Sequence, residues 1–416
     1  MKITSGRRVA VIAASLALLA AGCSKQSDTS ATPAATPASA APMTSAGMTS
    51  ADTSGGMTSA DTSASSDSMT SSPGSTSSAG PASSQQEVSA GGAGDFKIAF
   101  LMPDQASTRY EQHDRPGFEA ELKRICPGCT TLYNNANASA ATQQQQFNAA
   151  ISQGATVIVL DPVDSTAAAG LVQTAQSQNV KVIAYDRPVP EAKADYYVSF
   201  DNEKIGTLIA QSLVEKLKSG TIPDGGGILE VNGSPTDAAA GLIKKGIHAG
   251  LEGSGLTMLA EYDTPEWDPA KAQTWVSGQI SRFPDKIVGV VAANDGTGGG
   301  AIAAFKAAGV NPVPSITGND ATIAGLQLII SGDQYNTISK PSEIVAAAAA
   351  DVAYGLAQGT APQSDTVVFN TPSKLFTPVV ITQQNLKAEI IDKKIQTAAE
   401  LCTADYATAC QKLGIS

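Results

Sequence analysis

Planar polar side chains recur at the ends of short apolar runs in the C-terminal part of this chain. Asp161 follows the run that ends at Leu160, and Asp186 and Arg187 follow the next run. The same kind of side chain, together with one lysine, recurs at Asp104, Arg109, Asp237, Asn294, Asp320 and Lys340. Carboxylate, amide and guanidinium groups form paired hydrogen bonds, which suits vicinal hydroxyl groups. Tyr110 and Trp267 can stack on the C–H faces of a sugar ring, so the pattern indicates a polyol-binding rim.

The elements that must position these residues are strands alternating with amphipathic helices. The apolar runs predict strands at Lys97–Met102, Thr130–Tyr133, Thr156–Leu160, Lys181–Tyr185, Gly227–Val231, Leu256–Tyr262, Ile287–Ala292, Ser315–Thr317 and Tyr335–Ser339. Helical spacing predicts helices at Ala140–Gln153, Ser165–Gln178, Glu203–Lys218, Asp237–Leu251, Pro269–Arg282 and Gly298–Ala308. This alternation is typical of doubly wound α/β folds with parallel sheets, in which ligands bind beyond the carboxyl ends of the strands. The number of predicted strands exceeds what one open sheet comfortably holds, so we expect two lobes, each with its own sheet.

Composition divides the 416 residues into two unlike parts. Residues 1–94 contain no Phe, Tyr or Trp, and the first aromatic residue is Phe96. The net charge is −11. A nucleic-acid-binding protein needs a basic surface to neutralise phosphates, so this acidic chain is not expected to bind nucleic acid.

The N-terminus has the features of an export signal. Basic residues precede an apolar run from Val9 to Ala21, which is shorter than the about 20 residues of a membrane-spanning helix. Residues 1–22 are therefore expected to be a signal peptide, and the small residues before Cys23 resemble a bacterial lipobox, in which that cysteine carries the lipid. An ordinary secretory signal is the alternative. Residues 23–94, rich in Ser, Thr, Ala and Met, are expected to be a lipid-anchored, disordered tether outside the cytoplasmic membrane.

The remaining cysteines predict two disulfides in an exported protein. Cys126 and Cys129 form a C-x-x-C motif after a helical segment, for which a small-loop disulfide is expected, with zinc binding or redox catalysis as alternatives. Cys402 and Cys410 are then the second pair. The histidines, His113 and His248, lie far apart in sequence, and no metal site is expected. The glycine-rich run that starts at Gly296 follows a strand, but a nucleotide cofactor is not expected outside the cell, so no cofactor is predicted.

Several motifs in order resemble one known family. They are Ala184-Tyr-Asp-Arg187, Ser199-Phe-Asp-Asn-Glu-Lys204, Gly233-Ser-Pro-Thr-Asp237, Ala293-Asn-Asp295, Thr317-Gly-Asn-Asp320 and Lys340-Pro341. Together they resemble the D-xylose-binding group of ABC-importer solute receptors, within the type 1 periplasmic binding protein family. The resemblance implies two lobes joined by a three-strand hinge, with residues 95–202 and about 341–372 in lobe I, and 203–340 and about 373–416 in lobe II. It also implies sugar contacts from Arg109, Asp186, Arg187, Asp237, Asn294, Asp320 and Lys340, with Tyr110 and Trp267 as the aromatic faces.

The function that the resemblance implies is a monomeric receptor that passes a monosaccharide, xylose or a related aldose, to a membrane permease. One departure from the pattern concerns Ala238 and Ala239, which stand where relatives with this motif usually have two asparagines, so the sugar preference is open. A sugar-sensing adaptor that signals through a membrane partner is an alternative. A glycosidase is a third possibility, because Glu266 and Asp268 flank Trp267, but no catalytic pair is expected and the protein is not expected to be an enzyme.

Overall fold

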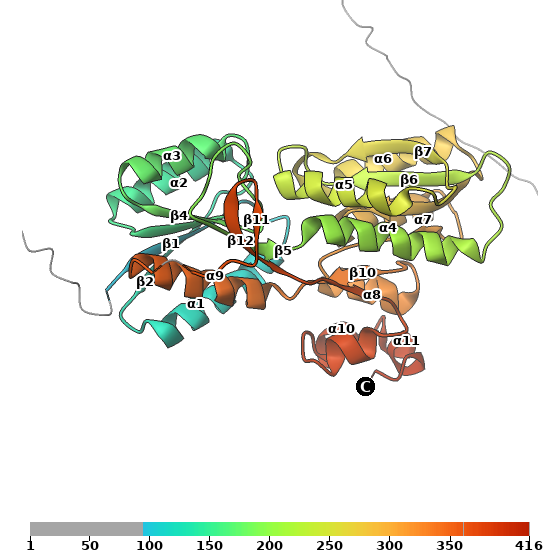
Figure 1. Ribbon diagram of the computed structural model, residues 1–416. Helices are drawn as coiled ribbons and strands as arrows, with labels where there is room; N and C mark the ends of the chain where they lie inside the picture. Colours follow the sequence, from blue (N-terminus) through green and yellow to red (C-terminus); the bar gives the residue numbers. More distant parts are fainter. Residues whose placement is uncertain (1–94, 361, 416) are drawn as a thin grey trace, which may run out of the picture. The chain divides into compact units, whose positions relative to one another are not determined.

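The computed structural model describes residues 95–360 and 362–415, all of which belong to one compact unit. They form two α/β lobes, each built on its own parallel sheet (Figure 1). The predicted signal peptide, tether and lipid-bearing Cys23 lie outside the described residues. Among the residues that are described, no helix is long and apolar enough to span a membrane.

Lobe I contains a sheet with the strand order β11-β12-β5-β4-β3-β1-β2. Its strands are β1 (Lys97–Met102), β2 (Thr130–Asn135), β3 (Val157–Leu160), β4 (Lys181–Tyr185), β5 (Tyr196–Phe200), β11 (Thr366–Val368) and β12 (Thr371–Phe376). Neighbouring strands are parallel except for the antiparallel pair β11–β12. Since β12 continues to Phe376, this sheet extends a few residues beyond the expected lobe boundary near residue 372.

Helices cover both faces of the lobe I sheet. They are α1 (Arg115–Ile125) and α9 (Ser342–Ala357) on one face, and α2 (Ala140–Ser152) and α3 (Ala168–Ser177) on the other (Figure 1). Side chains of a strand alternate between the two faces. Accordingly, Ile98 and Phe100 of β1 belong to the core on the α1 side, whereas Ala99 and Leu101 belong to the core on the α2 side. Coverage of both faces explains why the central strands β1, β3 and β4 are apolar almost throughout.

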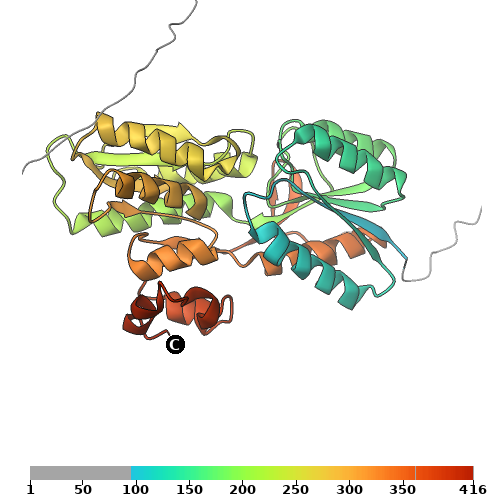
Figure 2. The same ribbon diagram turned by 180° about the vertical axis from the view of Figure 1, so that it is seen from behind.

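Lobe II repeats this plan around a smaller parallel sheet of order β7-β6-β8-β9. Its strands are β6 (Gly227–Asn232), β7 (Met258–Asp263), β8 (Ile287–Ala292) and β9 (Ser315–Ile316). Its helices are α4 (Asn202–Lys218) and α5 (Ala238–Leu251) on one face, and α6 (Pro269–Arg282) and α7 (Asp295–Ala307) on the other. Figure 2 shows α6 and α7 from behind.

The chain crosses between the lobes three times. The first crossing joins β5 to α4, the second joins β10 (Thr337–Ser339) to α9, and the third joins β12 to β13 (Val379–Ile381). Strands β10 and β13 form an antiparallel pair of their own. Three adjacent connections restrict the motion of one lobe to bending relative to the other, and they confirm the expected two-lobe fold with a three-strand hinge.

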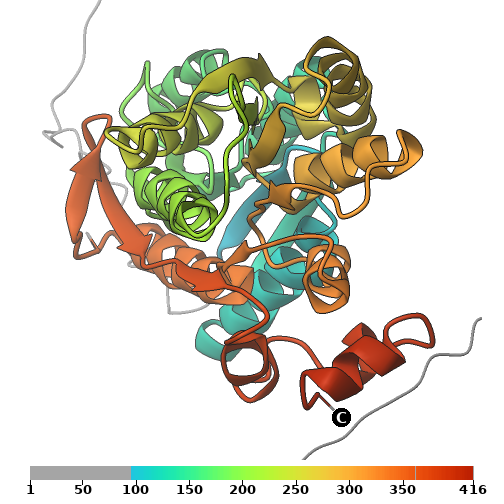
Figure 3. The same cartoon turned by 90° about the vertical axis from the view of Figure 1, so that its right-hand side faces the viewer.

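The C-terminal segment packs against α8 (Ile323–Ser331) of lobe II (Figure 3). It contains a short π-helical turn, η3 (Lys387–Ile391), and two short helices, α10 (Ala398–Leu401) and α11 (Ala407–Lys412). Leu386, Ile390 and Leu401 are fully buried in this contact. The sulfur atoms of Cys402 and Cys410 lie 2.01 Å apart, and those of Cys126 and Cys129 lie 2.02 Å apart, which is bonding distance.

The predicted strands and helices are all present, with ends that differ by about three residues or fewer. The elements that the sequence pattern did not indicate are the strands β5, β11, β12 and β13, the helices α8 and α9, and the short C-terminal helices, whereas α1 is the helical segment expected before Cys126. Four of these elements, β5, α9, β12 and β13, border the crossings between the lobes, so the hinge is the part of the fold that local patterns predicted least well.

Candidate functional site

All nine residues predicted to contact a ligand line a single cavity between the lobes. Lobe I supplies Arg109, Tyr110, Asp186 and Arg187, lobe II supplies Asp237, Trp267, Asn294 and Asp320, and the second crossing supplies Lys340. Most of these residues stand just beyond the carboxyl end of a parallel strand. The fold thus brings together residues whose positions, from Arg109 to Lys340, are spread over more than half of the sequence.

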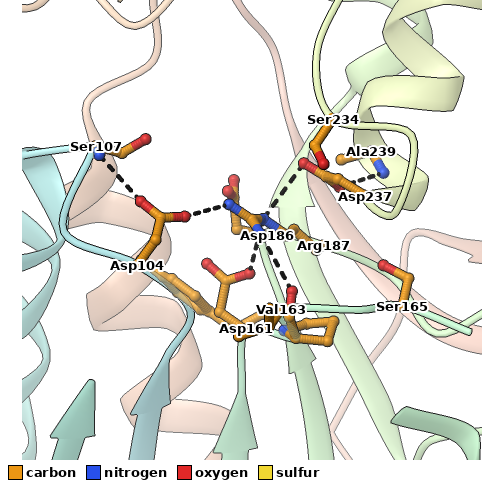
Figure 4. Close-up of polar contacts among 12 residues, drawn as sticks. Asp104, Ser107, Asp161, Val163, Ser165, Asp186, Arg187, Ser234, Asp237 and Ala239 are labelled. Carbon is orange, nitrogen blue, oxygen red and sulfur yellow. Dashed lines mark hydrogen bonds and ion pairs between the residues drawn. The ribbon is translucent and has the colours of Figure 1, made fainter. Parts of the chain in front are cut away.

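Arg187 is the centre of the first polar network in this cavity (Figure 4). Its Nη2 donates to Asp104 at 2.8 Å, and its Nε lies 3.4 Å from Asp161 Oδ1 and 3.3 Å from Asp237 Oδ2. Its Nη1 donates to the carbonyl oxygen of Pro162 at 3.2 Å. Asp104 and Asp161 belong to lobe I and Asp237 belongs to lobe II, so this guanidinium group joins the lobes electrostatically.

Burial dominates the electrostatics of this network. Arg187 is only 4% exposed, and Asp161 is fully buried. Burial alone would lower the pKa of Arg187, but Tyr110 and the carboxylates around it raise that pKa above its usual value. Burial raises the pKa of Asp161 well above its usual range, although Arg187 acts in the opposite direction. The arginine is therefore a permanent cation that compensates several costly buried carboxylates.

Asp186 is the centre of a second network. Its Oδ2 accepts from Arg109 Nη2 at 2.8 Å, and its Oδ1 lies 4.0 Å from the ammonium group of Lys340. Lys340 also lies 3.0 Å from Asp320 of lobe II. Burial acts to raise the pKa of Asp186, but Arg109, Lys340 and Arg187 together lower it below its usual value. Asp186 is thus held as a carboxylate able to accept hydrogen bonds.

Two of the lobe II residues, Asp237 and Asn294, are held in place because they cap the N-termini of helices. Asp237 is the N-cap of α5, and its Oδ1 accepts from the backbone N–H of Ala239 at 2.8 Å. Asn294 is the N-cap of α7, in a capping box with Thr297. Because capping occupies Oδ1 of each side chain, the second oxygen of Asp237 and the amide nitrogen of Asn294 are directed elsewhere. The former accepts from Trp267 Nε1 at 3.0 Å, which orients the indole ring in the cavity wall.

Three of the site residues have left-handed backbone conformations. The φ angles are 56° at Asp186, 57° at Trp267 and 100° at Asp320. Such angles are unfavourable for residues other than glycine, and aspartate tolerates them better than tryptophan does. Strained backbone of this kind concentrates at functional sites, where surrounding contacts hold it in place.

The cavity is small in this arrangement, at about 30 Å³. A larger cavity of about 460 Å³ adjoins it and shares the lining residues Ser107, Arg109, Trp267, Asn294, Asp320 and Lys340. Hydrogen bonds also join the lobes nearby, where Ser165 N–H donates to Thr236 O at 3.0 Å and Ala238 N–H donates to Ser165 Oγ at 3.1 Å. The polar groups of the site therefore pair mainly with each other, across lobes that are in contact.

Some residues of the site were not among the predicted contacts. Asp104 and Asp161, which the sequence placed on the polar rim but not among the sugar contacts, pair with Arg187. Asn202 and Asn319 line the cavity as well. Asn202 follows β5, a strand that the sequence pattern did not indicate. Of the two acidic residues beside Trp267, Glu266 pairs with Lys271, and Asp268 caps α6.

Comparisons with known proteins agree with this geometry. Residues 98–361 match the family model described as a periplasmic binding protein domain. The D-xylose-binding periplasmic protein of Escherichia coli K12 is 32% identical over 317 residues, which cover 74% of this chain and 93% of that protein. The Haemophilus influenzae protein of the same name is 30% identical, over 73% of this chain and 91% of its own length.

Solved structures lead to the same family. An ABC transporter solute binding protein from Clostridium phytofermentans, with bound β-D-glucose, superposes with a TM-score of 0.67 and 27% sequence identity. The match covers 73% of this chain and 99% of the other. The family match, the identity to both relatives and the two-lobe fold with its shared cavity agree, and the chain belongs to the periplasmic binding protein family.

Proposed function

We propose that this protein is an extracytoplasmic receptor that captures a monosaccharide between its lobes and delivers it to the permease of an ABC importer. The observation that carries the proposal is the cavity itself, in which bidentate polar groups from both lobes surround Trp267. Such groups bind the hydroxyls of a sugar, and the indole face covers its apolar C–H groups. The D-xylose-binding relatives and the glucose-bound structure support the same ligand class.

The charges favour an uncharged sugar over an acidic one. The two networks contain the cations Arg109, Arg187 and Lys340 and the carboxylates Asp104, Asp114, Asp161, Asp186, Asp237 and Asp320. Each cation already pairs with a carboxylate, so no buried positive charge remains to neutralise a phosphate or a sugar acid. Bringing an anion into this cavity would therefore be opposed by desolvation and by the carboxylates.

Closure around the sugar provides the signal for transport. The cavity lined by all nine predicted residues measures only about 30 Å³, so we expect the lobes to separate to admit a sugar and then to close on it. A sugar that contacts Arg187 in lobe I and Asp237 in lobe II binds the closed form more tightly than the open form and shifts the population toward it. The permease then distinguishes the loaded receptor by its shape.

Calorimetric titration tests this proposal. Xylose, glucose, galactose and arabinose are added separately, with glucose 6-phosphate and glucuronate as anionic controls. We expect saturable one-to-one binding of at least one neutral aldose and no measurable binding of the anions. The sugar recovered afterwards should be chemically unchanged, because the proposed role is capture and not catalysis. Tighter binding of an anionic sugar, or turnover of the ligand, would contradict the proposal.

Ala239 provides a test of sugar preference. It lines the cavity and is 5% exposed, at the position where relatives usually have an amide. Ala239→Asn should change the ratio of affinities for two aldoses, such as xylose and glucose, by about 2- to 12-fold, because one net hydrogen bond contributes about 0.5–1.5 kcal/mol. Ala249→Asn, on the exposed far end of the same helix, is the matched control and should leave the ratio unchanged. An unchanged ratio in both variants would exclude Ala239 from the specificity determinants.

The cysteines are assigned to a lipid anchor and two disulfides in this proposal. Cys23 would carry the lipid at the outer face of the membrane, with Cys126 bonded to Cys129 and Cys402 to Cys410. The wild-type protein should then fractionate with membranes, and Cys23→Ser should release it to the soluble fraction. The denatured, unreduced protein should contain no free thiol. A soluble wild-type protein or a titratable thiol would refute the corresponding assignment.

A further inference from the structure

A second polar cluster lies in lobe II, apart from the proposed sugar site. Glu230 of β6 is paired in register with Glu261 of β7, so both side chains stand on the same face of the sheet. His248 of α5 lies over them, with Nε2 3.1 Å from Glu230 Oε1 and 3.4 Å from Glu261 Oε2. One ligand atom from each residue can be chosen so that all lie within 4.8 Å of one another.

Glu230 lacks the hydrogen bonds that a buried carboxylate needs. The residue is 0% exposed, and neither of its carboxylate oxygens has a hydrogen-bond partner among the described residues. The nearby His248 Nε2 is at ion-pair distance but not in hydrogen-bonding geometry. Burying a carboxylate without such bonds is costly, and a bound cation would offset that cost. The Glu230 side chain lies beneath the two more exposed residues of the cluster, His248 and Glu261.

The local charge balance also calls for a cation. Asp263 of β7 lies next to the cluster, and Lys244 of α5 pairs with both Glu261 and Asp263. Three carboxylates, Glu230, Glu261 and Asp263, thus face one lysine and one histidine. When all three carboxylates are ionised and the imidazole is neutral, the group has two excess negative charges, which one divalent ion would balance.

We propose that Glu230, His248 and Glu261 bind one divalent transition-metal ion, with Zn²⁺ as the best match. Zinc accepts imidazole nitrogen together with carboxylate oxygen, whereas Ca²⁺ and Mg²⁺ prefer oxygen ligands alone. Zinc–ligand bonds of about 2.1 Å in tetrahedral geometry place neighbouring ligand atoms about 3.4 Å apart, close to both distances from His248 Nε2. The side chains of His248 and Glu261 are 49% and 34% exposed, which leaves room for water as the fourth ligand.

The metal would fasten α5 to the sheet of lobe II. Two of its ligands come from neighbouring strands and the third from the helix that covers them. Because a metal that binds only the folded state stabilises it, zinc should raise the unfolding temperature. Residues 230, 248 and 261 follow no known ligand spacing, which is why the site could not be recognised from the sequence.

Zinc titration of the sugar-free full chain tests this proposal, using protein that carries no histidine tag and has been freed of metal with a chelator. We expect one zinc ion per chain by calorimetry, together with a higher unfolding temperature in zinc. His248→Gln and Glu261→Gln should each weaken zinc binding by about tenfold or more, since even residues that only support metal ligands contribute about 10- to 100-fold. Both positions are partly exposed, so these variants should fold.

His113→Gln is the matched control, because it removes the chain's other imidazole and should leave zinc affinity unchanged. Zinc binding that survives in His248→Gln, or that His113→Gln abolishes, would overturn the assignment. The absence of saturable zinc binding to the wild type would overturn it as well, and so would stronger binding of Ca²⁺ than of Zn²⁺. None of these outcomes depends on sugar binding, so the two proposals can fail separately.

Discussion

Arg187→Ala is expected to weaken sugar binding by at least about 2 kcal/mol, which is roughly thirtyfold. The substitution removes a charged, bidentate donor from a buried cavity. It also leaves Asp104, Asp161 and Asp237 without their shared cation, and breaking a buried ion pair in this way costs about 3–5 kcal/mol. Calorimetric titration with the preferred aldose measures the first effect, and chemical unfolding measures the second.

Two further variants separate a loss of binding from a loss of folding. Arg187→Lys keeps a positive charge but loses the planar fork, so it should recover most of the stability and only part of the affinity. Arg282→Ala removes an exposed arginine at the end of α6 and should change neither quantity. Wild-type affinity in a folded Arg187→Ala protein would show that the sugar site has been assigned incorrectly.

Trp267→Ala is the second substitution for which a large effect is expected. Trp267 is 8% exposed, lines the cavity, and donates from its indole nitrogen to Asp237. Its removal eliminates the apolar face for the sugar ring and releases the carboxylate that it orients. We expect affinity to fall by about 2–4 kcal/mol, as for other buried aromatic anchors. Trp267→Phe keeps an aromatic face without the N–H group and should show an intermediate loss.

The chain provides a matched control for this substitution. Its other tryptophan, Trp275, stacks on Tyr262 with ring centroids 5.2 Å apart and does not line the candidate site. Trp275→Ala should therefore leave sugar affinity unchanged even if it lowers stability. Equal losses of affinity in the two variants would indicate a general effect on lobe II and would contradict a direct contact from Trp267.

Much of the site was predictable because it depends on local pattern. In a parallel sheet, the residue after a buried strand must lie at the carboxyl edge, so Asp186 and Arg187 were placed correctly once the run before them was identified as a strand. The same reasoning brought Asn294 and Asp320 to the cavity. What positions these residues is the alternation of strand and helix, which is visible in the sequence.

Pairing between side chains was not predictable in the same way. Arg187 meets Asp104 and Asp237, which are far from it in sequence and belong to different lobes. Which carboxylate an arginine contacts depends on how the lobes pack against each other, and the periodicity of the sequence carries no information about that packing. The proposed zinc site of Glu230, His248 and Glu261 shows the same limit. Its residues meet only because β6 pairs with β7 in this register and α5 crosses above them.

Local patterns did not indicate the hinge strand β12 or the short C-terminal helices, and the reason is different. Strand β12 contains a proline and a lysine and is only partly buried, so it lacks a continuous apolar run. The helices α10 and α11 are too short to display helical periodicity, and their burial depends on the surface of α8. Segments whose structure depends on distant partners carry weak local signals.

The most direct test of the account is a fluorescence titration of Trp275→Phe, in which Trp267 is the sole tryptophan. Because Trp267 lies in the wall of the cavity, xylose or another neutral aldose should produce a saturable change in its emission, with the same dissociation constant as calorimetry gives. Arg187→Ala in this background should shift the midpoint by roughly thirtyfold. No response to any pentose or hexose, in protein that remains folded, would contradict the assignment of this chain as a monosaccharide receptor.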